Sequence, residues 1–149
     1  FIGDGNNMMS SWLYFAALLG LELNLATPVD YALSKDVIAQ AKKMPLFDEN
    51  KIKFFNDPKE AIKDAFVVMS DTWVSMDQDK DKIKSFKGFG IDDKLMNLAD
   101  KDAIFLHCLP AYRGSEVESS VIDGSQSVVF KQSENKLHVN KGIMTWLSK

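Results

Sequence analysis

The chain has 149 residues, of which 46% are hydrophobic and 26% are charged, and its formal net charge at pH 7 is −3. This composition is that of an ordinary globular domain, and it excludes fibrous and disordered classes. The negative net charge argues against a general nucleic-acid-binding surface. The longest apolar stretch, residues 12–23, is shorter than the roughly 20 residues that cross a bilayer, so we expect no membrane-spanning segment.

The chain contains one cysteine, Cys108, which cannot form an internal disulfide. A lone cysteine fits a reducing, cytoplasmic compartment and leaves the thiol free for chemistry, and a buried structural cysteine is the alternative. The sequence opens with Phe1 and Ile2, without an initiator methionine, as if cut within a strand. We therefore expect residues 1–149 to form a single domain of a longer protein.

The spacing of apolar residues predicts short strands that alternate with helices. The expected strands are residues 1–2, 21–26, 51–55, 66–69 and 103–106. The expected helices are residues 8–19, 34–43, 58–64, 79–86, 92–98, 116–122 and 133–147. Ser34 and Asp57 are placed as helix caps, and the alternating charges of residues 79–86 are interpreted as a solvated helix face.

This alternation indicates βαβ units, and hence an α/β fold with a doubly wound, mostly parallel five-stranded sheet and helices on both faces. The expected strand order is 3-2-1-4-5. In such sheets ligands bind beyond the carboxyl ends of the strands, where the order reverses. Polar residues that follow strands 1, 4 and 5 would meet in that crevice, namely Asn6, Asn7, Asp71, Ser75, His107 and Cys108.

The turn after the first strand, Gly3-Asp4-Gly5, carries two of the three glycines of a dinucleotide-binding fingerprint. Met8 stands where the third glycine belongs, so a nucleotide site is weakly supported and the glycines can simply permit a tight turn. Adjacent asparagines at the mouth of a sheet can instead bind the carboxylate or amine of a small zwitterion.

Asp71 and Cys108 are the candidate reactive groups. A carboxylate that accepts hydrogen bonds from a primary ammonium, with a thiol beside it, can orient the amine and assist its loss of a proton. In isolation Asp71 is equally well explained as a loop cap, and His107 as a structural histidine. We expect no metal site, because the two histidines and the cysteine lie on separate elements without ligand spacing.

Four segments, taken together and in order, resemble the successive motifs of the ornithine carbamoyltransferase family. They are Gly3-Asp4-Gly5-Asn6-Asn7, then Asp71-Thr72-Trp73-Val74-Ser75-Met76, then Phe105-Leu106-His107-Cys108-Leu109-Pro110-Ala111-Tyr112-Arg113-Gly114, then Glu134-Asn135-Lys136-Leu137-His138. The resemblance covers essentially the whole chain. It corresponds to the carboxyl-terminal, ornithine-binding half, whereas the Ser-Thr-Arg-Thr-Arg and His-Pro-x-Gln motifs of the carbamoyl-phosphate-binding half are absent from this sequence.

The resemblance implies transfer of a carbamoyl group from carbamoyl phosphate to the side-chain amine of ornithine, giving citrulline and phosphate, without a cofactor or metal. It implies that the amino acid is bound by Asn7, Asp71, Ser75 and Met76. It implies that Asp71 and Cys108 are catalytic, and that carbamoyl phosphate is contacted by Cys108, Leu109 and Lys136. It also implies a homotrimer for the full-length protein, with no nucleic-acid or membrane partner.

Two positions depart from the family pattern. Asp77 stands where the family has glycine after Ser-Met, and Lys136 stands where the family has an arginine that contacts carbamoyl phosphate. Lysine keeps the charge of arginine but loses its planar bidentate fork, so weaker phosphate binding is expected. Because the chain has a single arginine, drift toward lysine explains this substitution equally well.

Several functional alternatives stay open at this stage. The amine acceptor can be putrescine or an acylated ornithine, the protein can be a non-catalytic amino-acid-binding paralogue, or the fold can be a plain nucleotide-binding module. The isolated domain is expected not to turn over, because half of the site lies elsewhere. The sequence does not separate a biosynthetic from a catabolic role in arginine metabolism.

Overall fold

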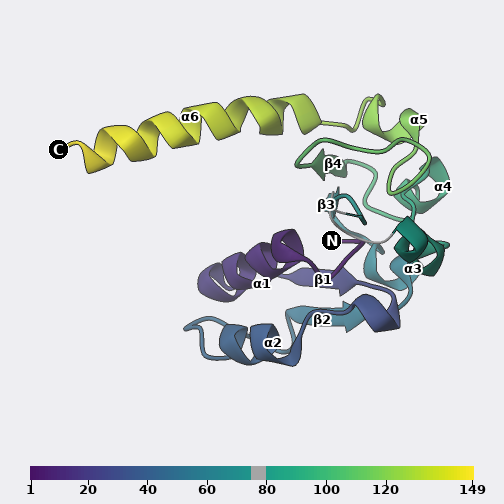
Figure 1. The fold of residues 1–149 in the computed structure, drawn as a ribbon, viewed down its shortest axis with the longest axis horizontal. Coiled ribbons are helices and arrows are strands. Elements are labelled where there is room, and N and C mark those ends of the chain that lie inside the picture. The colour runs from purple at the N-terminus through teal and green to yellow at the C-terminus, as the bar shows by residue number, and fades with distance from the viewer. Residues whose placement is uncertain (75–79) are drawn as a thin grey trace.

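The computed structural model describes residues 1–74 and 80–149 of the chain (Figure 1). The α-helices are α1 (Asn7–Leu19), α2 (Lys35–Ala41), α3 (Pro58–Ala61), α4 (Asp93–Met96), α5 (Ser119–Ile122) and α6 (Val129–Leu147). The strands are β1 (Leu23–Ala26), β2 (Ile52–Phe55), β3 (Val67–Ser70) and β4 (Ile104–His107). Two 3₁₀-helices, η1 (Val29–Tyr31) and η2 (Lys80–Phe86), complete the described elements.

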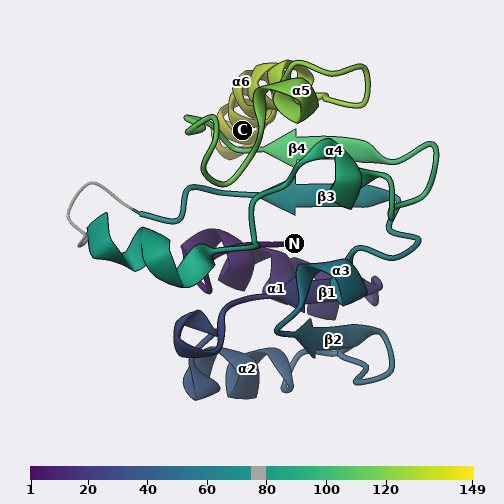
Figure 2. The same cartoon turned by 90° about the vertical axis from the view of Figure 1, so that its right-hand side faces the viewer.

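The four strands form two parallel pairs, β1 with β2 and β3 with β4. The start of the chain lies between the pairs (Figure 2). The Ile2 N–H donates to the Met69 carbonyl at 2.9 Å, and Ile2 forms a parallel bridge to Ala26. The α/β class with parallel strands is confirmed, whereas the expected first strand is only a bridge, so the five strands are not assigned as one sheet and their order stays a prediction.

Neighbouring residues in the strands face two different cores, as the period of two requires. Ala26, Val68 and Phe105 belong to one core, together with Ile2, Leu95 and Val117. Leu25 and Met69 belong to the other core, together with Met9, Leu13 and Ala41 from helices α1 and α2. The strand layer is therefore covered on both faces, which leaves the ends of the strands as the place for a polar site.

Local sequence chemistry sets the helix starts. The side chains of Ser34, Asp57 and Asp92 each accept a hydrogen bond from a backbone N–H in the first turn of α2, α3 and α4. The expected caps at Ser34 and Asp57 are thus confirmed. Each of these helices ends two or three residues earlier than the apolar pattern predicted. The apolar pattern does not mark the last residue of a short helix accurately.

The last helix begins at Val129 and not at residue 133 as expected. The preceding segment continues the hydrogen bonding of β4, because the Phe105 N–H donates to the Gln126 carbonyl and the Val128 N–H donates to the Phe105 carbonyl. The chain therefore turns directly from that edge into the helix. Beyond its first turns α6 projects away from the body of the domain (Figure 1).

The lysine-rich segment also differs from the expectation. Within the described range it is the 3₁₀-helix η2, and it is not simply a solvated face, since the side chains of Lys82 and Phe86 are buried. A search of the described residues for a helix long and apolar enough to cross a bilayer finds none.

Candidate active site at the carboxyl ends of the strands

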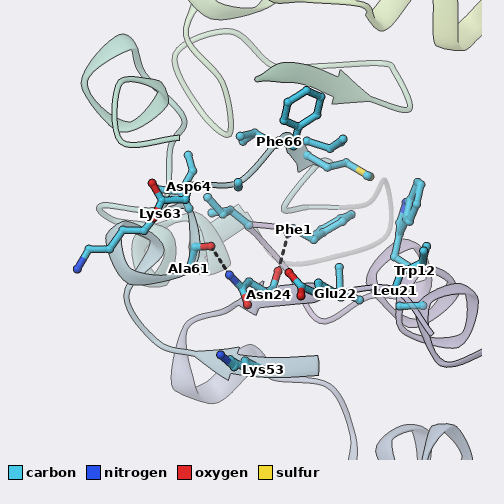
Figure 3. A pocket seen from close by; sticks show the side chains of 18 of the residues that line it. Phe1, Trp12, Leu21, Glu22, Asn24, Lys53, Ala61, Lys63, Asp64 and Phe66 are labelled. Atoms are coloured by element: carbon cyan, nitrogen blue, oxygen red, sulfur yellow. Dashed lines mark hydrogen bonds between the residues drawn. The ribbon is translucent and has the colours of Figure 1, made fainter. Parts of the chain in front are cut away.

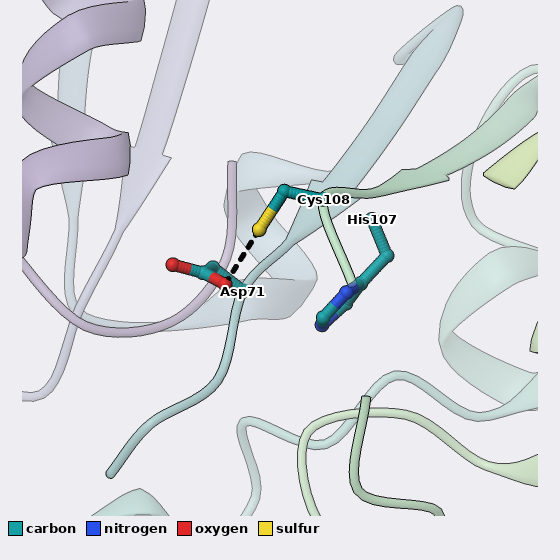
Figure 4. Close-up of side chains that lie close together, drawn as sticks. All are labelled: Asp71, His107 and Cys108. Carbon is teal, nitrogen blue, oxygen red and sulfur yellow. Dashed lines mark hydrogen bonds between the residues drawn. The ribbon is translucent and has the colours of Figure 1, made fainter. Parts of the chain in front are cut away.

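The site is centred on Asp71, which directly follows β3 and is buried. Its Oδ1 accepts a hydrogen bond from the Cys108 thiol at 2.8 Å, and its Oδ2 accepts one from the Asn6 side-chain amide at 3.1 Å. Cys108 directly follows β4, so two neighbouring strand ends bring the pair together (Figure 4). Asp71 and Cys108 thus meet at one edge of the strands, as the parallel register requires.

Asn6 joins Asp71 to the start of α1. Its Oδ1 accepts hydrogen bonds from the Met8 and Met9 N–H groups, which caps the helix, while its amide nitrogen donates to Asp71. The turn before it needs glycine, because a Cβ on Gly5 would lie 2.6 Å from the backbone of Tyr31, Ala32 and Leu33. Gly5 is thus required because two backbone segments approach each other closely at this position.

Asn7, the asparagine that the resemblance assigns to the amino acid, is the exposed first residue of α1. The neighbouring Asn6 is the one whose side chain contacts Asp71. A role for Asn7 in ligand binding stays a prediction. The expected residues Ser75 and Met76, and the unusual Asp77, lie outside the described residues.

The thiol of Cys108 is held in its protonated form. Burial raises the pKa of Cys108 to about 12, and the hydrogen bond to Asp71 and the negative charge of Asp71 act in the same direction. The positive charge of Lys136 opposes this shift and lowers the pKa. Because the thiolate is the nucleophilic form of cysteine, this environment suits a hydrogen-bond donor rather than a covalent nucleophile.

Helix α6 reaches the end of β4 through two side chains spaced one turn apart. The Gln132 Oε1 accepts a hydrogen bond from the His107 N–H at 3.0 Å, and the Lys136 ammonium donates to the Cys108 carbonyl. Residues four apart lie on the same helix face, so both contacts follow from one docking of the helix. This places the cationic Lys136 beside Cys108, and its contact with carbamoyl phosphate stays a prediction.

His107 lies behind the site as a buried support. Its Nδ1 accepts the Leu109 N–H at 2.9 Å, and its Nε2 lies 3.5 Å from Oε1 of the buried Glu116. The same Glu116 oxygen accepts the Tyr112 N–H at 2.6 Å. Leu109 adopts a φ of 58°, a left-handed conformation that is unfavourable for leucine, and the His107 contact helps to hold it there.

A buried ion pair flanks the site on the side of the glycine turn. The Lys82 ammonium lies 2.6 Å from Oδ2 of Asp4, and both side chains are only 9% exposed. Burial raises the pKa of Asp4 and the negative charge of Asp71 raises it further, whereas the hydrogen bond and charge of Lys82 lower it. Asp4 and Asp71 are therefore electrostatic neighbours.

Sequence reasoning missed four of these supporting residues, namely Asp4, Lys82, Glu116 and Gln132. Lys82 lies in a segment whose charge pattern indicates a solvated helix face, and Gln132 lies just before the expected start of the last helix. The partners of both lie far away along the chain. Asp4 stands inside a quoted motif and Glu116 stands two residues after one, and the signal that could have found them is that an acidic residue buried beside a strand end requires a partner.

The argument against a metal site used the sequence spacing of the two histidines and the cysteine, and it did not include Asp71. In the described part of the chain, donor atoms of Asp71, His107 and Cys108 all lie within 4.8 Å of one another, because adjacent strand ends bring together residues that are distant in sequence. These groups are engaged otherwise, since Cys108 donates to Asp71 and His107 accepts the N–H of Leu109. That the site works without a metal stays a prediction.

A pocket of about 580 Å³ opens at the opposite, amino ends of β1 and β3 (Figure 3). Of the predicted site residues that the structure describes, none lines this pocket. The Asp71 and Cys108 edge is therefore a separate region of the domain.

Residues 1–147 match the family described as "Aspartate/ornithine carbamoyltransferase, Asp/Orn binding domain". The chain belongs to the aspartate/ornithine carbamoyltransferase family.

Individual relatives in this carbamoyltransferase family agree with the assignment. The chain is 49% identical to an ornithine carbamoyltransferase of Helicobacter hepaticus and 50% identical to one of Wolinella succinogenes, in both cases along its whole length. It spans 46% and 50% of those proteins. The crystal structure of the anabolic ornithine carbamoyltransferase of Campylobacter jejuni superposes with a TM-score of 0.91 at 46% identity, and the match covers 99% of this chain and 50% of that one.

The raised pKa of Cys108 yields a prediction about its reactivity. A pKa of about 12, against roughly 8.5 for a free thiol, makes the thiolate about a thousandfold scarcer near pH 8. Iodoacetamide should therefore modify the native chain far more slowly than the urea-unfolded chain, with a rate that still rises above pH 10. Asp71→Asn removes the negative charge and should speed modification at pH 9 at least about tenfold. A native rate that levels off near pH 9 would contradict this environment for the thiol.

The position of His107 yields a prediction about stability. His107→Ala leaves the Leu109 N–H without its acceptor and creates a buried cavity, so the free energy of unfolding should fall by about 2–3 kcal/mol. The other histidine, His138, is exposed on α6 and is the matched control, with an expected change below about 0.5 kcal/mol. Urea denaturation followed by circular dichroism measures both, and equal effects would refute a supporting role.

Proposed function

We propose that the chain is the ornithine-binding domain, residues 1–149, of an ornithine carbamoyltransferase. The full-length protein would transfer the carbamoyl group of carbamoyl phosphate to the side-chain amine of L-ornithine, giving L-citrulline and phosphate. The observation that carries the proposal is the buried Asp71 carboxylate, hydrogen-bonded to the Cys108 thiol at the carboxyl ends of β3 and β4. The identity to whole ornithine carbamoyltransferases, of which the chain spans about half, supports the substrate assignment.

The chemistry requires a neutral amine, whereas the side-chain amine of ornithine is an ammonium near pH 7. A carboxylate accepts hydrogen bonds only, and its two oxygens have about four lone-pair sites, so Asp71 can receive an ammonium in addition to Asn6 and Cys108. We infer that Asp71 orients the amine and assists the loss of one proton to solvent. The freed nitrogen lone pair then attacks the carbamoyl carbon, the bond from that carbon to the phosphate oxygen breaks, and the remaining surplus proton of the nitrogen leaves with the phosphate.

Cys108 acts in this proposal as a protonated donor that fixes the Asp71 carboxylate, and it lies against the carbamoyl group. By resemblance to the family, Cys108 and Leu109 contact the carbamoyl phosphate, with Leu109 using its backbone carbonyl because its N–H already donates to His107. Lys136 supplies positive charge near the phosphate. The phosphate is an adequate leaving group, so positioning and charge suffice and no cofactor is proposed.

Asn7, Ser75 and Met76 complete the proposed amino-acid subsite by resemblance to the family. On the same ground we propose a homotrimer in the cytoplasm that takes part in arginine metabolism and uses small-molecule substrates alone. Because the carbamoyl-phosphate-binding half lies outside this chain, we propose that the isolated domain does not turn over.

Citrulline formation by the full-length protein tests the assignment. Asp71→Asn and Cys108→Ala should each lower kcat/KM at least about 100-fold, because the attacking nitrogen loses its placement. Asp102→Asn, at the opposite end of β4, is the matched control and should retain activity. In a panel of ornithine, putrescine and N-acetylornithine, a preference for either of the last two would redirect the assignment. Ornithine binding by calorimetry without any product would instead indicate a binding paralogue.

The position of Lys136 yields a prediction about carbamoyl phosphate. Lys136→Met removes the charge beside Cys108 and should raise the KM for carbamoyl phosphate about tenfold, whereas Lys136→Arg should preserve or lower it through bidentate contact. Lys131→Met changes an exposed lysine of the same helix and serves as the control. An unchanged KM in Lys136→Met would remove this lysine from the phosphate site.

A further inference from the structure

Lys82 lies in an unusual environment for a lysine. Its side chain is 9% exposed, and its ammonium contacts the equally buried Asp4 at 2.6 Å. The ammonium also lies 4.9 Å from the ring centre of Tyr31 and 5.7 Å from that of Phe86. Burying a charged pair is costly unless the ions are well partnered, and the two aromatic rings add attraction for the cation.

The pair connects segments that are far apart in the sequence. Asp4 lies in the glycine turn that ends in Asn6, Tyr31 ends η1, and Lys82 lies in η2. The turn is also tied to η1 by the Gly5 N–H, which donates to the Tyr31 carbonyl at 2.8 Å. Lys82 therefore holds the turn from which the Asn6 side chain extends to Asp71.

The pair also affects the charge of the site. Asp4 and Asp71 are two buried carboxylates close enough for the charge of one to raise the pKa of the other. Without a neighbouring cation, Asp4 would add a second negative charge close to Asp71. With Asp4 neutralised by Lys82, Asp71 carries the net negative charge that an ammonium group needs.

We propose that Lys82 is a positioning residue for the candidate site, because its ammonium neutralises Asp4 and fixes the turn that carries Asn6, so that of these two carboxylates Asp71 presents its negative charge to a cationic amine. This inference deepens the proposed function and rests on the amine-binding role of Asp71. Its decisive test reads the charge at Cys108 and needs no turnover, so the two proposals can fail separately.

The test uses Cys108, the single cysteine, as a local probe of charge. Its thiol contacts Asp71, and among the residues that the structure describes the charges that shift its pKa are those of Asp71 and Lys136. The Asp4 and Lys82 pair is joined to Asp71 through the turn that carries Asn6. At pH 9 and low ionic strength, Asp4→Asn removes one negative charge and should speed iodoacetamide modification about three- to tenfold. Lys82→Met leaves Asp4 uncompensated and should slow it by a similar factor, about three- to tenfold. The double variant should return to the wild-type rate.

The opposite signs separate charge compensation from simple support. If the pair only held the turn, either single variant would loosen the site and expose the thiol, and both rates would rise together. Lys101→Met and Asp102→Asn are matched controls, because they change the net charge equally at an exposed pair before β4. Neither control should change the rate by more than about twofold.

Further variants guard against loss of folding. Lys82→Arg keeps the charge and should retain the wild-type rate, and urea denaturation confirms that each variant is folded. If Lys82→Met does not fold, the near-isosteric Asp4→Asn measured against Asp102→Asn still decides. Rates that rise together, or an Asp4→Asn rate equal to that of wild type, would overturn the proposal. If Asp4→Asn and Lys82→Met shift the modification rate in opposite directions but the full-length protein does not turn over ornithine, the charge compensation stands and the proposed function is refuted.

Discussion

The structure around the site depends on the Asp71 carboxylate, which directly follows β3 and contacts two other segments. Cys108 approaches it from the neighbouring strand and Asn6 from the start of α1. The parallel register of β3 and β4 pairs Ser70 with His107, so the next residue of each strand, Asp71 and Cys108, emerges side by side. Without this carboxylate the Cys108 thiol and the Asn6 amide would have no common partner, and this edge of the strands would lose the negative charge of Asp71.

The sequence was sufficient for the parts of the molecule that follow local rules. Alternating apolar strands and helices predicted the parallel α/β class, and strand ends predicted that Asp71, His107 and Cys108 would gather at one edge. The sequence was not sufficient to predict the burial of Lys82. Its neighbours are lysines and aspartates, which indicate a solvated segment, and its partner Asp4 lies 78 residues earlier in the chain. Nor could the sequence show that Asn6, and not Asn7, is the asparagine that contacts Asp71, since that depends on which one caps α1.

The supporting residues show how the edge tolerates unfavourable groups. Leu109 has a positive φ, and His107 and Glu116 are polar yet almost fully buried. Each is accompanied by a specific contact, since His107 accepts the Leu109 N–H and Glu116 accepts the Tyr112 N–H. Such costs are sustained only where the surrounding structure fixes the geometry, and they concentrate here beside Cys108.

The arrangement of charge explains why Cys108 is better suited to placement than to nucleophilic attack. A thiolate beside Asp71 would put two negative charges in hydrogen-bond contact, whereas a thiol gives the carboxylate a donor and leaves one anion in the crevice. The positive charge comes from two lysines, one on η2 and one on α6. Lys82 neutralises Asp4 from within the domain, and Lys136 reaches the Cys108 carbonyl from α6. Among the described residues, Asp71 is thus left to accept a cation and Lys136 to attract an anion, which is the division of charge that the proposed reaction between a cationic amine and an anionic carbamoyl donor uses.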